Sequence, residues 1–147
     1  MKKNKIFKEW LKKAEEDFGF ARTSLKETKY YAQIGFHFHQ AAEKYLKAFV
    51  IANHLEFRPV HNLMELLNVC KGRNHKIEEI EEACRFLNPF YIDTRYPVHW
   101  PTHYDKETAT NAMKSASKGP RPQGGALKPK FLNPKPRSRN KFGMTKR

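Results

Sequence analysis

Apolar residues recur every three or four positions along residues 30–53, and this spacing predicts one long central helix. The apolar stripe of that helix consists of Ile34, Phe38, Ala41, Ala42, Tyr45, Leu46, Ala48, Phe49 and Ala52. Four polar residues, Gln40, Glu43, Lys44 and Lys47, gather on the opposite side and are expected to face solvent. The pattern therefore predicts a packing helix around which the rest of the chain is organised.

Three apolar residues of this helix, Phe36, Val50 and Ile51, fall outside the main stripe. A helix that buries its stripe within its own bundle leaves such residues for a second surface. We therefore expect the helix to meet another subunit, and closed two-fold pairing is the commonest way for identical chains to do so. The prediction is a homodimer.

Four further segments show helical spacing, namely residues 5–28, 61–70, 76–87 and the stretch from Asp105 to Gly119-Pro120. Residues 55–60 form a loop in this interpretation, because Pro59 disfavours helix at the residue before it and lacks a backbone donor. Short connections and the lack of a strand pattern predict an all-α fold. The expected architecture is an antiparallel up-down helical bundle of about five helices.

The net charge of +14 is distributed unevenly along the 147 residues. Residues 119–147 hold nine Lys and Arg, five prolines, four glycines and no acidic residue, so residues 1–118 carry only +5. A segment of that composition buries too little apolar surface to offset the entropy of ordering it. We predict one bundle domain at 1–118 and a disordered basic tail at 119–147, either without a selected role or able to hold an anionic polymer.

Other features narrow the class of protein. No apolar run is long enough for a membrane span and no signal peptide is evident, so a cytoplasmic protein without membrane contact is expected. Cys70 and Cys84 lack the spacing of a zinc site and are expected to be buried thiols. His37 and His39 point apart on a helix, and prolines interrupt His99 and His103. We expect no metal and no cofactor.

The most unusual stretch is residues 88–105, NPFYIDTRYPVHWPTHYD, in which five aromatic residues, two histidines and one arginine occur among three prolines. Arg95 could support charge on a phosphate, while His99 or His103 could move a proton near neutral pH, so these three are the candidate catalytic residues. Arg95 is also a candidate for binding nucleotide or RNA, together with three rings that could stack on bases, Tyr96, Trp100 and Tyr104. Alternatively, Arg95 pairs with an acid such as Asp17 or Asp93 and the rings form a lid over the bundle.

Four segments carry a family resemblance: AEEDFGFA at residues 14–21, HQAAEKYLKAFV at 39–50, HNLMELL at 61–67 and IDTRYP at 92–97. In this order they resemble the motifs of the HEPN family (higher eukaryotes and prokaryotes nucleotide-binding domain). The resemblance covers residues 5–118 and excludes the tail. It implies an up-down bundle that commonly forms a homodimer.

The resemblance also implies what the chain does. Some HEPN proteins resemble non-catalytic partners of a minimal nucleotidyltransferase, often in a two-gene module of toxin–antitoxin type, and some are thought to bind nucleotide. Others are metal-independent endoribonucleases, in which a histidine follows an arginine after four to six residues. Here three residues separate Arg95 from His99 and seven separate it from His103, so neither pair has the family spacing. His61 is expected to open the third helix, where packing or capping explains it without catalysis.

Overall fold

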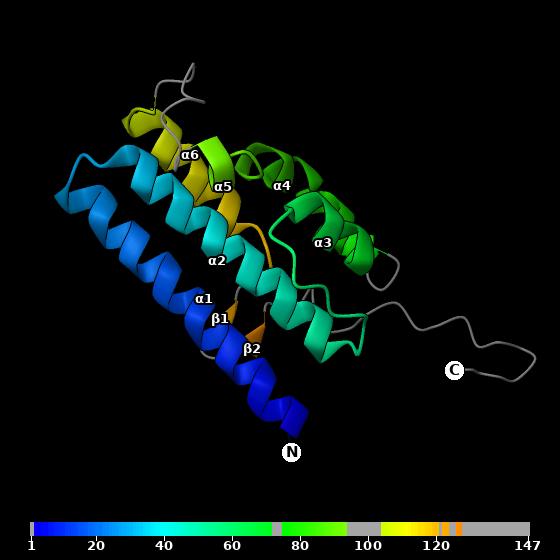
Figure 1. The fold of residues 1–147 in the computed structure, drawn as a ribbon. Helices are drawn as coiled ribbons and strands as arrows, with labels where there is room; N and C mark the ends of the chain where they lie inside the picture. The colour runs from blue at the N-terminus through cyan, green and yellow to red at the C-terminus, as the bar shows by residue number, and fades with distance from the viewer. Residues whose placement is uncertain (1, 72–74, 94–103, 121, 124–125, 128–147) are drawn as a thin grey trace, which may run out of the picture.

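The computed structural model describes residues 2–71, 75–93, 104–120, 122–123 and 126–127 (Figure 1). The elements in chain order are α1 (Lys2–Glu27), α2 (Tyr31–Ala52), α3 (Leu63–Lys71), a 3₁₀ helix η1 (His75–Ile80), α4 (Glu81–Leu87), α5 (Phe90–Asp93) and α6 (Lys106–Ser117). Two short strands, β1 (Pro122–Gln123) and β2 (Ala126–Leu127), pair antiparallel, with Pro122 opposite Leu127. None of the described helices combines the length and the apolar character that a membrane crossing requires.

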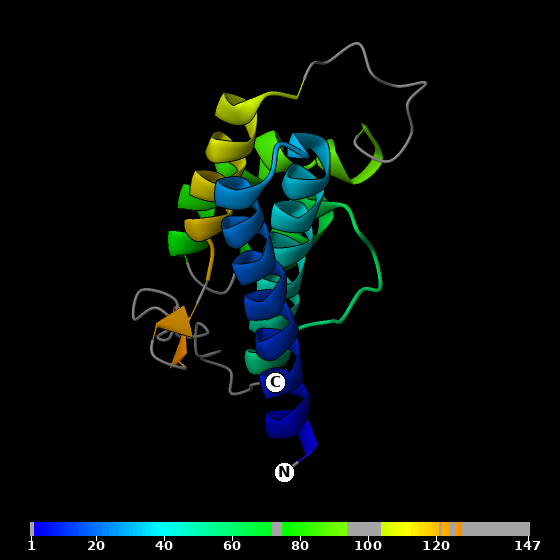
Figure 2. The same cartoon turned by 90° about the vertical axis from the view of Figure 1, so that its left-hand side faces the viewer.

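Helix α2 lies at the centre of the bundle and packs against α1, α3, α5 and α6. Figures 1 and 2 show α1 alongside α2 in the opposite direction, and α6 contacts both of them. The stripe predicted from the sequence forms the core as far as Phe49, and its members Phe38, Tyr45 and Phe49 are fully buried. The last predicted member, Ala52, is exposed at the end of α2. The predicted all-α helical bundle is therefore confirmed.

Local hydrogen bonds fix the carboxyl end of α2 and the amino end of α6. After α2 the chain turns at His54, whose φ of 56° is in the left-handed region. The backbone N–H groups of His54 and Leu55 donate to the carbonyl oxygens of Ile51 and Val50, at 3.2 and 2.9 Å, which is the double hydrogen bond of a Schellman motif. At α6 the carboxylate of Asp105 accepts a hydrogen bond from the backbone N–H of Thr108, as an N-cap residue does.

Two elements differ from the sequence-based expectation. The fourth predicted helix, residues 76–87, is divided into η1 and α4. Helix α5 occupies part of the stretch that the prolines had marked as irregular. Pro89 directly precedes α5, and at the start of a helix the missing N–H of proline has no intrahelical partner to lose. The proline therefore begins a short helix instead of preventing one.

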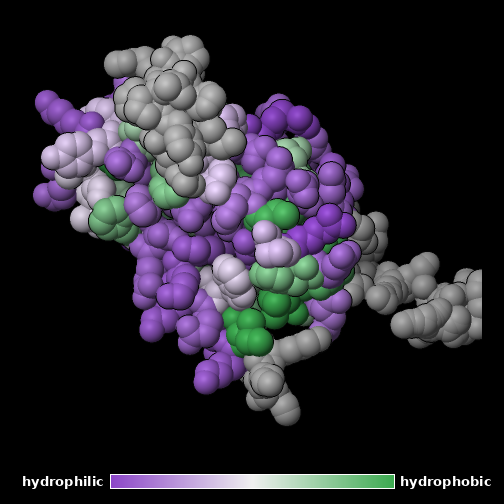
Figure 3. All heavy atoms as spheres, in the orientation of Figure 1, coloured by the Kyte–Doolittle hydropathy of each residue, from purple (hydrophilic) through white to green (hydrophobic). Residues whose placement is uncertain are grey.

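One of the three residues assigned to a second surface lies in the core. Val50 is 1% exposed and belongs to the main cluster of buried side chains, so it contributes to the core of the bundle and not to a second surface. Phe36 and Ile51 are only half-buried, as expected for residues outside the stripe. Figure 3 shows apolar side chains gathered where α2 ends, on a face that is otherwise largely hydrophilic.

Candidate functional site

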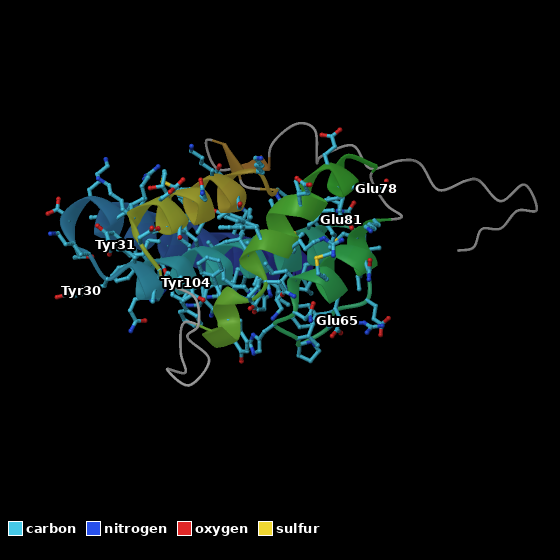
Figure 4. The ribbon with its side chains drawn as sticks, turned by 90° about the horizontal axis from the view of Figure 1, so that it is seen from above. Tyr30, Tyr31, Glu65, Glu78, Glu81 and Tyr104 are labelled. Atoms are coloured by element: carbon cyan, nitrogen blue, oxygen red, sulfur yellow. The ribbon has the colours of Figure 1, made fainter. Side chains whose placement is uncertain are left out.

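The structure describes one of the six predicted site residues. Tyr104 is half-buried immediately before the N-cap of α6. Tyr104 is labelled in Figure 4. Its ring centroid is 5.4 Å from that of Phe90 in α5. The other five, Arg95, Tyr96, His99, Trp100 and His103, lie outside the described residues. Their predicted roles stay predictions.

The contact between Phe90 and Tyr104 nevertheless restricts the predicted site. It brings together the two ends of the segment that contains Arg95 and His103. In the sequence Arg95 comes two residues after the end of α5, and His103 is the residue before Tyr104. The described residues on both flanks of the predicted site therefore meet at α5.

Helix α5 is itself fixed closely on α2. The ring of Phe90 lies directly over the backbone of Gly35, where a Cβ atom would come within 2.3 Å of Phe90 Cε2. Only glycine leaves room for this approach. In addition, the side chain of Asn88 accepts a hydrogen bond of 2.8 Å from the backbone N–H of Leu63 at the start of α3. These contacts fix α5 against the amino-terminal part of α2, and Asn88 links the turn before α5 to the start of α3.

Next to α5 lies a polar group that we call the Glu43 cluster: Glu43, Lys47, His61 and Tyr91. One carboxylate oxygen of Glu43 is 3.1 Å from Nδ1 of His61, and the other accepts from Nζ of Lys47 at 2.8 Å. The imidazole of His61 stacks on the ring of Tyr91, with centroids 4.5 Å apart and planes at 15°. Glu43 is 3% exposed, whereas the side chain of His61 is 48% exposed. The cluster thus reaches from the core to the surface.

The position of Glu43 and Lys47 corrects the sequence-based prediction, which had placed them in solvent. Lys47 is 4% exposed. Its ammonium lies 5.4 Å from the ring centroid of Trp10 and 5.8 Å from that of Phe57, so two aromatic faces and one carboxylate replace water around the charge. Trp10 of α1 and Phe57 of the loop after α2 therefore cover part of the face of α2 that the helical periodicity had marked as polar.

His39 lies beneath this surface. It is fully buried, and its ring centroid is 5.7 Å from that of Tyr91. Neither ring nitrogen makes a hydrogen bond of standard geometry within the described residues. Burial lowers the pKa of His39 to about 4, against the opposing effect of the Glu43 charge. His39 is therefore neutral at pH 7, as a core histidine.

A known protein family matches this chain along the length of the bundle. The HEPN domain family model matches residues 7–118. The chain belongs to the HEPN family. This agrees with the resemblance seen in the sequence, and the match ends at the boundary predicted for the bundle.

Two solved structures share the HEPN fold with this chain. One is the crystal structure of TT1696 from Thermus thermophilus, with 28% identity and a TM-score of 0.65, covering 76% of this chain and 91% of that one. The other is the crystal structure of ST0689, an archaeal HEPN homologue, with 25% identity and a TM-score of 0.61, covering 76% of this chain and 89% of that one. No curated protein matches this chain.

The Glu43 cluster joins two of the HEPN motifs. Residues 39–50 supply Glu43 and Lys47, and residues 61–67 supply His61. Capping does not explain His61, because Asn62 is the residue whose side chain accepts hydrogen bonds from the backbone N–H groups of Met64 and Glu65. Reasoning from the sequence had set His61 aside. The sequence did contain a signal for this cluster: both motifs include ionisable residues, Glu43 and Lys47 in one and His61 in the other, which the packing of a helix does not require.

A second polar group lies where α1 meets α2. Asp17 accepts a hydrogen bond of 2.5 Å from Nζ of Lys44 and lies 3.5 Å from Nδ1 of His37. Burial acts to raise the pKa of Asp17, but hydrogen bonds from His37 and Lys44 outweigh it and lower the pKa. Asp17 thus has a structural partner on α2. The alternative prediction, that Arg95 pairs with an acid such as Asp17, stays a prediction because Arg95 lies outside the described residues.

The remaining ionisable groups of the described residues offer no metal centre. No group of three or more His, Cys, Asp or Glu side chains in that part of the chain could hold a metal ion. Cys70 and Cys84 are buried free thiols, and burial raises the pKa of each to about 12. Thiols with such pKa values are unreactive at neutral pH.

Proposed function

We propose that this HEPN protein acts with a minimal nucleotidyltransferase in a two-gene module of toxin–antitoxin type and binds nucleotide or RNA through the segment around Arg95. Family membership supports the partnership, because it is one of the recurring roles of HEPN proteins. The observation that carries the binding proposal is the contact of Phe90 with Tyr104, which ties both ends of the Arg95 segment to α5 beside the Glu43 cluster. Arg95 supplies the charge for phosphate, and Tyr96, Trp100 and Tyr104 supply stacking rings.

Purification of the tagged full-length chain from its own cells tests the partnership. We expect a small nucleotidyltransferase to copurify in stoichiometric amount, and Arg95→Ala is compared in parallel.

Titration of the purified chain with adenosine 5′-monophosphate (AMP) then tests nucleotide binding, which Arg95→Ala should weaken at least tenfold. A purified complex without a nucleotidyltransferase contradicts the partnership, and equal affinity of wild type and Arg95→Ala contradicts the binding segment.

A metal-independent endoribonuclease is the second candidate function. The same contact favours it, since Arg95 and His103 belong to a segment whose ends meet at α5. In that reaction His99 or His103 would move the proton and Arg95 would stabilise the charge on phosphorus. Expression of this chain alone should then arrest growth, and Arg95→Ala should relieve the arrest. RNA left intact by the purified chain in EDTA rules this candidate out.

A further inference from the structure

The segment that follows α2 has the side-chain pattern of a single β-strand. The side chains of Glu56 and Arg58 lie together, with Nη2 of Arg58 3.7 Å from Oε1 of Glu56. The ring of Phe57, between them in the sequence, packs instead on Trp10, at 5.7 Å between centroids, and lies over the ammonium of Lys47. In a strand, successive side chains point to opposite faces in this way. Residues 56–58 are thus extended and held to the bundle by Phe57.

The backbone of this extended segment is not paired with another strand. The backbone N–H groups of Glu56, Phe57 and Arg58 donate to no other described residue. All three residues are exposed, so water satisfies these groups in the free protein. An exposed, unpaired backbone offers donors and acceptors to a second extended chain, which can add to it as a further strand.

A groove of about 500 Å³, which we call the Arg58 groove, lies between this segment and one face of α3. Its lining consists of Leu55, Glu56, Arg58, Glu65, Asn68 and Val69. The last three share one face of α3, because they are three and four positions apart. Ligand sites in proteins commonly have volumes of about 300–1,000 Å³. A peptide strand added to the segment would place alternate side chains in this groove.

The side chains of the groove select the chemistry of the peptide. Arg58 is paired with Glu56, whereas the exposed carboxylate of Glu65 has no ion pair with a described residue. Such a carboxylate favours Lys or Arg, through a charge-assisted hydrogen bond. Leu55 and Val69 supply apolar surface for an aliphatic side chain. The groove therefore fits an extended peptide with a basic residue two positions from an aliphatic one, since alternate residues share a face.

We propose that the Arg58 groove binds an extended, basic peptide segment of a partner protein. The peptide pairs with the backbone of residues 56–58 and places a Lys or Arg side chain against Glu65. Peptide fits this groove better than nucleic acid does, because the carboxylates of Glu56 and Glu65 repel phosphate. The inference does not rest on the proposed function, and none of its residues belongs to the Arg95 segment.

Selection of peptides on the immobilised full-length chain tests the proposal. The probe is a library of random short peptides displayed on phage, and an enriched peptide is then synthesised. We expect enriched sequences to carry Lys or Arg two positions from Val, Ile or Leu. Calorimetry should show about tenfold weaker binding to Glu65→Lys, because the reversed charge repels the basic residue. The matched control Glu78→Lys makes the same change in η1, away from Glu65 (Figure 4), and should bind as wild type does.

Hydrogen exchange of the wild-type chain tests the strand pairing without any variant. Each edge of a strand presents the N–H groups of alternate residues. The peptide should therefore slow exchange of the amides of Glu56 and Arg58, or of the amide of Phe57, by about tenfold or more. Protection of none of these three amides overturns the proposed pairing, even if a variant does not fold.

Other results also overturn the proposal. One is that no sequence is enriched above selection on the bare support, and another is that the peptide binds Glu65→Lys as tightly as wild type. If peptide binds only after residues 128–147 are removed, this chain's own basic tail occupies the groove, and the assignment to a partner is wrong. If Glu65→Lys converts a wild-type dimer to a monomer in light scattering, the occupant is a second copy of the chain instead.

Discussion

At the scale of single residues, the buried pair of Glu43 and Lys47 is the feature with the largest expected effect on stability. Lys47→Met leaves the carboxylate of Glu43 buried without its cation, and breaking a buried pair in this way costs about 3–5 kcal/mol of unfolding free energy. Lys44→Met is the matched control on the same helix, because its ion pair with Asp17 is more exposed and should cost about 1 kcal/mol or less. Urea denaturation measures both. Equal losses would show that burial of the pair contributes nothing.

His39 makes the stability depend on pH. Its pKa is lowered from 6.5 in the unfolded chain to about 4 in the folded protein, so between these values the unfolded state binds more protons. Its contribution is therefore complete above pH 6.5 and is lost as pH falls towards 4, by roughly 3 kcal/mol. Glu43 and His61 also face this ring, and their charges act in opposite directions on its pKa.

Unfolding free energies of wild type and His39→Phe at pH 7 and pH 4.5 test this dependence. Other groups titrate in both proteins, so the difference between their pH slopes isolates His39. The variant should have the shallower slope. Parallel slopes would mean that His39 is accessible to protons in the folded state.

At the scale of elements, the position of α5 depends on Gly35. Gly35→Ala brings a Cβ atom to 2.3 Å from the ring of Phe90, so the ring and α5 must move, at a cost of about 1–3 kcal/mol. Gly19 in α1 is the control, since a Cβ atom there meets nothing within 4 Å. Gly19→Ala should stabilise the helix by about 0.5–1 kcal/mol. Shifts of the thermal midpoint with opposite sign relative to wild type are expected, and a neutral Gly35→Ala would contradict the contact.

The long elements could be predicted from the sequence because their periodicity is strong over many turns. Helices α1 and α2 begin and end within a few residues of the predicted bounds. Helix α5 was missed because four residues are too few for a periodic signal and prolines surround them. The Glu43 cluster was missed for another reason: the contact of Glu43 with His61 depends on how α3 follows α2, which helical periodicity does not encode.

At the scale of the whole molecule, the boundary between bundle and tail has a direct test. The family match ends at residue 118, and the last core residue of α6 is Ala116. Pro120, the second residue of the predicted tail, is buried, so the sharper cut removes residues 121–147. That removal should leave the thermal midpoint of the bundle nearly unchanged, because the rest of the tail is expected to bury little apolar surface. Differential scanning calorimetry compares the two lengths. A drop of more than several degrees would show that the tail packs on the bundle.

The last prediction is the homodimer, for which the exposed rings of α1 and α2 supply a surface. Phe20 is 57% exposed, and its ring contacts His37, which in turn contacts Phe36. Phe20 is exposed and the other two rings are half-buried, and a connected aromatic group at the surface is typical of an interface. A specific interface buries more than about 1,000 Å² in total. We expect light scattering to give a dimer at tens of micromolar, on the order of a usual assembly test. Phe20→Glu should give a folded monomer, because a carboxylate at the interface loses its hydration, whereas Phe86→Glu on α4 should remain a dimer. A wild-type monomer at that concentration would contradict the prediction. If Phe20→Glu is still a dimer, the interface lies elsewhere on the molecule. The half-buried Ile51 at the end of α2 is then the next position to change.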